Sequence, residues 1–234
     1  MNARRSRLAR RSFLAKAGAG AAAVGVTLGA APALAQSGAP DSGTWLPARH
    51  GEDDWLDRIP GKHRFFFDTT TVGSLGQALL YANNYYTGNK NGYGLEATDL
   101  AVVICMRHEA TAFAYSDAMW AKYTKAFAER LGFNDPKTGQ PPTLNVYRAS
   151  GYGASLRNGG VTLESLIKNG MHFAVCQLAT RRNAGIIAQQ NGAKADEVYE
   201  EIVSNLIPNA HMVPAGIVAV NRAQERGYSI VSVT

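Results

Sequence analysis

Five short apolar segments, separated by segments with helical periodicity, constrain the fold of this chain more than any other feature. The run LAVVIC at residues 100–105 is apolar at every position, which is typical of a strand buried on both faces of a parallel sheet. Strands that alternate with helices along the chain indicate a sheet covered by helices on both faces. The sequence therefore predicts an α/β fold with three α/β/α layers and a mainly parallel, five-stranded, flavodoxin-like sheet, with strands near 64–68, 99–106, 172–176, 211–214 and 228–233.

The order of the strands bears on the two cysteines of the chain, Cys105 and Cys176. In a flavodoxin-like order the first strand lies between the second and the third. Two strand spacings then separate the ends of the second and third strands by about 10 Å, too far for a disulfide. We therefore expect no bond between the cysteines, and we expect Cys105, inside an apolar run, to be an inert core residue.

The first 35 residues have the organisation of an export signal. A basic segment at residues 4–16 precedes a run rich in Ala and Gly, and an Ala-Leu-Ala site ends at residue 35, which is typical of a cleaved signal peptide rather than of an N-terminal membrane helix. The pair Arg10-Arg11, followed by Ser-Phe-Leu, resembles the twin-arginine export signal. The pattern predicts cleavage before Gln36 and a periplasmic or secreted protein.

Removal of this segment changes the charge of the chain. The full sequence has 24 basic and 18 acidic residues and a net charge of +6. Six of the basic residues and none of the acidic ones lie in residues 1–35, so the remainder has 18 of each. A neutral mature chain gives no indication of a nucleic-acid partner, which requires a basic face. The absence of a later long apolar run predicts no membrane span after cleavage.

The mature chain divides into a lead-in and one domain. Residues 36–62 begin with a segment rich in Gly, Ser and Pro and predict an extended N-terminal arm, and residues 63–234 contain the α/β alternation. Trp45 and Trp55 are expected to pin the arm onto the domain. We expect His50 and the acidic cluster at residues 52–54 to be solvated surface groups.

Cys176 ends the third predicted strand just before a helix. Backbone N–H groups and the dipole at a helix N-terminus stabilise an anion and so favour a thiolate. Arg181 and Arg182, one turn into the helix, add positive charge. This pattern predicts a reactive thiol, although a buried free cysteine that serves only as a small core residue would give the same pattern.

The other strand ends supply further candidate groups, because the carboxyl ends of parallel strands share one edge of the sheet. Thr69 and Thr70 follow the first strand, and Arg107 and His108 follow the second. His108 could act as a base, a thiolate partner or a metal ligand, or could be a loop histidine bonded to the backbone. We predict Cys176 and His108 as catalytic residues, and we predict Arg107, Thr69, Thr70, Arg181 and Arg182 as ligand-binding residues.

The remaining histidines and the metal-binding residue types give weaker signals. His63, His172 and His211 begin strands, at the opposite edge of the sheet, and are expected to be structural. Cys105 and His108 form a lone pair rather than the repeated ligand motif of a closed zinc site. The sequence therefore predicts neither a metal site nor a cofactor.

Two segments resemble the DsrE/TusD sulfur-relay family, including its DsrE/DsrF-like members. The segment VCQLATRRNAG at residues 175–185 resembles the region around that family's sulfur-carrying cysteine, and MVPAGIVAVNRAQERGY at residues 212–228 resembles the close of its domains. The resemblance covers residues 64–233. It implies a DsrE-like α/β/α fold, a persulfide on Cys176, assembly as a dimer, trimer or hexamer, and a partner protein that donates or accepts sulfur.

Three functions agree with these patterns. The first is sulfur transfer or thiol redox chemistry through Cys176. The second is a ligand-, metal- or haem-binding module at the carboxyl edge of the sheet. The third is a non-catalytic oligomeric partner of a periplasmic redox complex.

Overall fold

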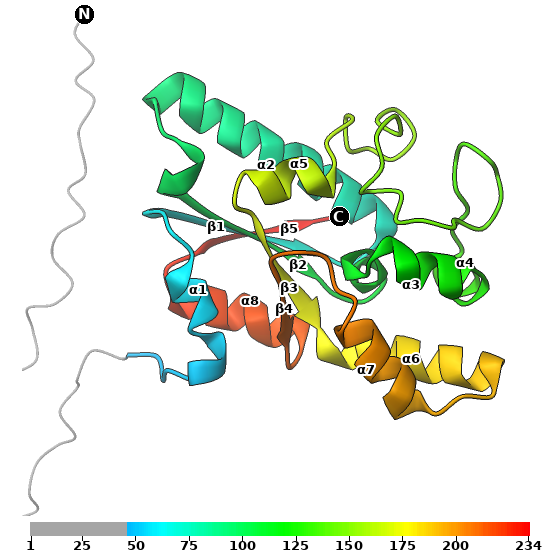
Figure 1. Ribbon diagram of the computed structural model, residues 1–234. Coiled ribbons are helices and arrows are strands. Elements are labelled where there is room, and N and C mark those ends of the chain that lie inside the picture. Colours follow the sequence, from blue (N-terminus) through cyan, green and yellow to red (C-terminus); the bar gives the residue numbers. More distant parts are fainter. Residues whose placement is uncertain (1–45) are drawn as a thin grey trace, which may run out of the picture. The chain divides into compact units, whose positions relative to one another are not determined.

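Five parallel strands form the centre of the fold in the computed structural model, which describes residues 46–234 (Figure 1). The predicted signal peptide at residues 1–35, the first part of the predicted arm and Trp45 lie outside the described residues. All pairings between neighbouring strands are parallel. The strands are β1 (His63–Thr69), β2 (Leu100–Met106), β3 (His172–Cys176), β4 (Ala210–Val213) and β5 (Ser229–Val233).

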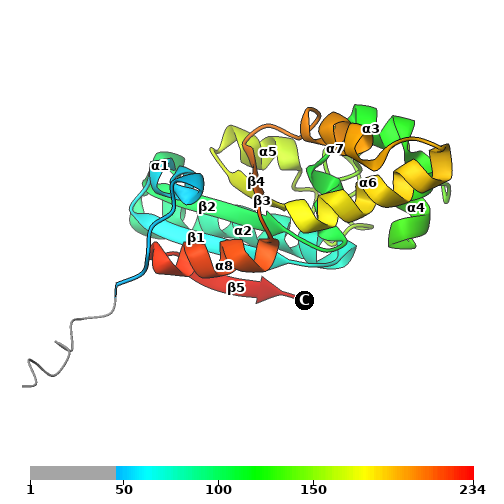
Figure 2. The ribbon, with the colours of Figure 1, turned by 90° about the horizontal axis from the view of Figure 1, so that it is seen from below.

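Helices cover both faces of this sheet and confirm the predicted three-layer α/β/α fold. One face packs against α2 (Val72–Tyr93) and α5 (Leu163–Lys168), and the other against α1 (Trp55–Arg58) and α8 (Gly216–Glu225) (Figures 1 and 2). The remaining helices gather toward the carboxyl end of the sheet; they are α3 (Asp117–Lys122), α4 (Thr124–Leu131), α6 (Gln177–Asn191) and α7 (Ala195–Val203). Short 3-10 turns lie at Gly51–Asp53, Ala97–Asp99 and Ala110–Ala114. No helix in the described part of the chain combines the length and apolar character needed to cross a membrane.

The strand order differs from the one expected. The order is β4-β3-β2-β1-β5, so β2 and β3 are direct neighbours and β1 does not separate them. Cys105 pairs with Ala174, two residues before Cys176 on the adjacent strand. The predicted separation of two strand spacings is therefore wrong, although both cysteines are free thiols in the structure.

Three local predictions also need correction. The Gly and Asn content of residues 87–94 predicts a loop, but residues 87–93 form the last part of α2. The helix is closed by its C-cap Gly94, which adopts the left-handed conformation at φ 69°. Ser116 is a plausible N-cap and predicts one helix over residues 116–131, but this segment is broken at Tyr123 into α3 and α4. The sequence also predicts a short strand at residues 144–146, but these residues lie in the irregular segment before α5.

Two hydrophobic cores lie on opposite faces of the sheet. The larger includes alternate residues of β2 packed against α2 and α5, and the smaller includes the intervening residues of β2 packed against α1 and α8. Cys105 belongs to the smaller core and is fully buried, with its Sγ 3.6 Å from the carbonyl oxygen of Gly216. Burial, and then the nearby Asp68 carboxylate, raise the pKa of the Cys105 thiol well above its usual value. This environment agrees with the inert role expected for Cys105.

Residues 46–62 fold onto the domain instead of remaining extended. Leu56 and Ile59 are buried in the smaller core, and the Trp55 ring stacks on His211 with 4.1 Å between ring centroids, which confirms the expected docking role of Trp55. Asp53 was expected to be solvated, but it is buried and forms an ion pair with Arg222 at 3.7 Å. The local sequence could not show this, because Arg222 comes from α8 at the other end of the chain.

His211, which stacks on Trp55, also contacts a second histidine: Nδ1 of His172 lies 2.8 Å from Nε2 of His211. Burial lowers the pKa of His172, while burial and then the His172 charge lower the pKa of His211 to about 4. Unfolded histidines titrate near pH 6.5. As the pH falls from about 6.5 toward 4, these histidines therefore bind more protons in the unfolded chain than in the folded protein. The free energy of unfolding decreases as a result.

We expect this decrease to be on the order of 1–2 kcal/mol, reduced from the unscreened value because both rings are partly exposed. Urea unfolding at a series of pH values measures it. His211→Phe keeps a ring against Trp55 but cannot titrate, so its stability should decrease less over this pH range than that of the wild type. The exposed His63, changed to Gln, is the control. Equal pH dependence in the wild type and His211→Phe would contradict the assignment.

Candidate functional site

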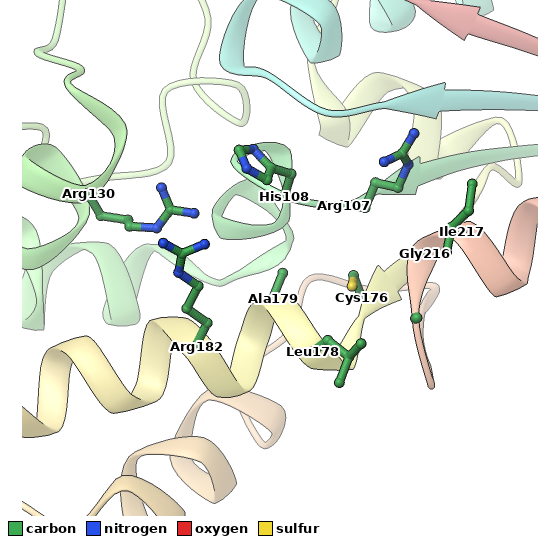
Figure 3. A pocket seen from close by; sticks show the side chains of 10 residues that line it. Arg107, His108, Arg130, Cys176, Leu178, Ala179, Arg182, Gly216 and Ile217 are labelled. Carbon is green, nitrogen blue, oxygen red and sulfur yellow. The ribbon is translucent and has the colours of Figure 1, made fainter.

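A cavity of about 280 Å³ lies at the carboxyl edge of the sheet, where β2 and β3 end. It is bounded by the loop after β2, the end of α4, and the first turns of α6 and α8. Four of the predicted site residues line it, namely Cys176, His108, Arg107 and Arg182 (Figure 3). The structure thus brings together side chains that are up to 75 positions apart in the sequence between Arg107 and Arg182.

Cys176 is both the last residue of β3 and the N-cap of α6. Side chains alternate between the faces of a strand, so Cys176 points to the same face as Ala174, toward the beginning of α8. Thr180 Oγ1 donates a hydrogen bond to the Cys176 carbonyl oxygen at 3.0 Å, which fixes the backbone at this junction. The side chain is 7% exposed and its accessible part lies in the cavity. The thiol is therefore held in a defined position but can still be reached.

Two helix N-termini meet beside this thiol. Neither the N-cap of α6, Cys176, nor that of α8, Ala215, provides a side-chain hydrogen bond to the first helical turn. The close approach of α8 depends on Gly216, because a Cβ at this position would lie 2.5 Å from the Cβ of Arg107. First-turn N–H groups and aligned peptide dipoles favour negative charge. Both helices therefore contribute positive potential at the cavity.

Arg107 adds a fixed positive charge to the wall of the cavity. Its Nε and Nη2 donate to the two carboxylate oxygens of Asp68 at 2.7 and 2.9 Å, a bidentate pair. Asp68 is 4% exposed and also accepts a hydrogen bond from Ser232 at 3.4 Å. The hydrogen bond with Asp68 raises the pKa of Arg107. Since its fork is already occupied, Arg107 shapes the site more than it offers donors to a ligand.

Arg130 and Arg182 form the most cationic part of the cavity. Their side chains extend toward one another, Arg130 from the end of α4 and Arg182 from α6 (Figure 3). Among residues 46–234, no carboxylate oxygen lies within 4.0 Å of either guanidinium, and the buried Nε of Arg130 has no hydrogen-bond partner there. Sequence reasoning missed Arg130, because an arginine near a helix end has no local sign that it faces another helix.

His108 lies in the loop that leaves β2. It has a left-handed backbone conformation with φ 57°, which is uncommon for residues other than glycine. The loop is fixed by hydrogen bonds from the N–H groups of Arg107 and Glu109 to the carbonyl oxygens of Thr69 and Thr70. The His108 side chain is half exposed, and its Nδ1 is 3.9 Å from a Glu109 carboxylate oxygen. The His108 imidazole is therefore accessible from the cavity.

The other predicted ligand-binding residues do not line this cavity. Thr69 is fully buried and its hydroxyl donates to the Cys105 carbonyl oxygen at 2.7 Å, so it cannot contact a ligand. Thr70 contributes backbone hydrogen bonds to the loop around His108. Arg181 points elsewhere, with an ion pair to Asp196 at 3.4 Å and its guanidinium 4.0 Å above the Tyr199 ring. Successive helix residues point in different directions, which explains why Arg182 reaches the cavity and Arg181 does not.

The cavity residues do not form an evident metal centre. Within the part of the chain that the structure describes, no group of three or more His, Cys, Asp or Glu side chains is arranged to hold a metal ion.

Comparisons with known proteins assign no activity to this chain. No family model matches the chain, and no curated protein matches it. Among solved structures, the chain is similar to the protein of unknown function MTH1491 from Methanobacterium thermoautotrophicum. The two are 13% identical with a TM-score of 0.36, and the match covers 73% of this chain and 99% of that one.

Proposed function

We propose that this protein is an exported, DsrE-like sulfur carrier that holds sulfane sulfur as a persulfide on Cys176. One observation carries the proposal: Cys176, which is 7% exposed whereas Cys105 is 0% exposed, lies in a cavity where two uncapped helix N-termini converge. Such an environment stabilises both a thiolate and a persulfide anion. The twin-arginine pattern supports export, and the resemblance around residues 175–185 supports the carrier role.

The transfer we propose is a thiolate attack with no net oxidation. The Cys176 thiolate attacks the outer sulfur of an organic persulfide, R–S–SH. A new S–S bond forms to Cys176, the S–S bond of the donor breaks, and the donor leaves as the thiolate R–S⁻. Discharge is the same reaction in the opposite direction, with an acceptor thiolate attacking the outer sulfur on Cys176. Such exchange requires an accessible thiolate and a stabilised leaving group.

His108 and the surrounding surface have distinct roles in this proposal. His108 is the one imidazole among the described cavity residues, so we assign it the acceptance of the thiol proton. Leu178 and Ile217, which are 64% and 59% exposed, lie beside the cysteine in the cavity lining. Exposed apolar side chains at this place support contact with the apolar part of a sulfur donor or acceptor, including a partner protein or a second copy of this chain.

Mass spectrometry after incubation with a small organic persulfide tests the carrier function. We expect the intact mature protein to gain one sulfur atom, to lose it on reduction, and to carry it on the peptide that contains Cys176. Cys105→Ala should load to the same extent as the wild type, since the Cys105 side chain is fully buried. Cys176→Ser should not load. Equal loading of Cys176→Ser, or no loading of the wild type, would refute the proposal.

A non-covalent binding module for an anionic ligand is the second candidate. Arg130 and Arg182, which face the cavity and have no carboxylate partner among residues 46–234, favour it. It predicts that Cys176→Ser binds the ligand as tightly as the wild type does and that no sulfur is transferred. The persulfide experiment therefore separates the two candidates.

A further inference from the structure

Arg130 and Arg182 differ from the other arginines near the cavity in their ion pairing. Arg107 is neutralised by Asp68, Arg148 contacts Asp117 and Glu164, and Arg181 contacts Asp196. Arg130 and Arg182 approach each other instead, although like charges repel (Figure 3). The buried Nε of Arg130 has no acceptor within the described residues. An anion bound between the two guanidinium groups would offset their repulsion and accept their hydrogen bonds.

The spacing along α6 places this pair relative to the thiol. Cys176, Ala179 and Arg182 line the cavity at intervals of three residues, so they follow one face of the helix. Six residues of α-helix correspond to about 9 Å along the axis. The small side chain of Ala179 leaves the space between Cys176 and Arg182 open. A ligand can thus reach the thiol with one end and the arginines with the other.

We propose that Arg130 and Arg182 form an oxyanion subsite for the sulfur compound that reacts at Cys176, an inference that rests on the proposed carrier function. The ligand class is a small organic acid whose carboxylate, sulfonate or phosphate group is several bonds from its sulfur. Guanidinium groups bind such planar or tetrahedral oxyanions through paired N–H donors. Two guanidinium groups from different helices also fix the orientation of the ligand, which places its sulfur at Cys176.

Two aromatic disulfides that differ in charge test the subsite. Dithiobis(nitrobenzoate) carries a carboxylate on each ring, and dithiodipyridine carries none. In both cases the Cys176 thiolate attacks one sulfur, the S–S bond breaks, and an aryl thiolate is released and measured by its absorbance. For the protein, the rate with the anionic reagent is divided by the rate with the neutral reagent. The normalised ratio is this value divided by the corresponding value for a small free thiol. This normalisation removes the intrinsic reactivity of the reagents.

We expect the normalised ratio to exceed one in Cys105→Ala protein, in which Cys176 is the sole thiol. Arg130→Gln and Arg182→Gln should each lower it by roughly two- to tenfold, the range for one charge at partly screened distances. Arg182→Lys retains the charge but not the planar guanidinium group, so its normalised ratio should lie between those of the unsubstituted residue and Arg182→Gln. Arg181→Gln is the matched control and should leave the ratio unchanged, because Arg181 is paired with Asp196 outside the cavity.

The outcomes distinguish this inference from the function on which it rests. A normalised ratio near one, or equal effects of Arg181→Gln and Arg182→Gln, would overturn the subsite while Cys176 remained a reactive carrier. A Cys176 that reacts with neither reagent in the folded protein would overturn the carrier function and the subsite together. Thermal unfolding of each variant verifies that a changed ratio does not come from loss of the fold.

Discussion

In the folded protein, iodoacetamide is expected to label Cys176 roughly a hundredfold or more faster than Cys105. Cys176 borders the cavity, whereas Cys105 is 0% exposed between the sheet and α8. Reaction at Cys105 requires an opening of the core, and openings of central strands cost a large part of the global stability. Burial also raises the pKa of Cys105, so little of its reactive thiolate is present even when the thiol becomes accessible.

Peptide mapping after timed alkylation measures both rates in one sample. Cys176→Ser should retain only the slow phase, and Cys105→Ala should retain only the fast one. In concentrated urea the two cysteines should react at similar rates, since the environments that distinguish them are lost. Comparable labelling of both cysteines in the native protein would show that Cys176 is a packing residue and would remove the basis for sulfur transfer.

Gly76→Ala is expected to destabilise the protein by about 1–3 kcal/mol or more. Gly76 lies in α2 at its contact with the irregular segment before α5. A Cβ there would lie 2.0 Å from the Leu156 carbonyl oxygen and 2.7 Å from the Tyr147 hydroxyl. The backbone contact cannot be relieved by rotation of a side chain, so the helix and the segment must move apart. This cost exceeds the gain of about 1 kcal/mol that alanine normally brings to a helix.

Gly88→Ala in the same helix is the matched control. No atom lies within 4 Å of a Cβ built at Gly88, and the residue is exposed. Here only helix propensity changes, so we expect a gain in stability of about 0.5–1 kcal/mol. Urea unfolding of the two variants should therefore give shifts of opposite sign. Destabilisation of similar size at both positions would contradict the close contact between Gly76 and Leu156.

The positions of all five strands, the three-layer fold and the identity of the cysteine that lines the cavity could be predicted from the sequence. These features depend on local pattern: an apolar run such as residues 100–105 can be satisfied only by burial on both faces. The change from the strand that ends at Cys176 to a helical pattern is likewise visible within a few residues.

The tertiary structure alone decided which elements became neighbours. Strand order depends on how crossover connections pack, so the direct pairing of β2 with β3 is not encoded in either strand. The burial of Asp53 against Arg222 and the contact of His172 with His211 have the same origin. The approach of Arg130 to Arg182 at the edge of the cavity also depends on packing, because the two residues come from different helices. Local periodicity fixes which face of an element is buried, but the partner of that face is chosen by the free energy of packing the whole chain.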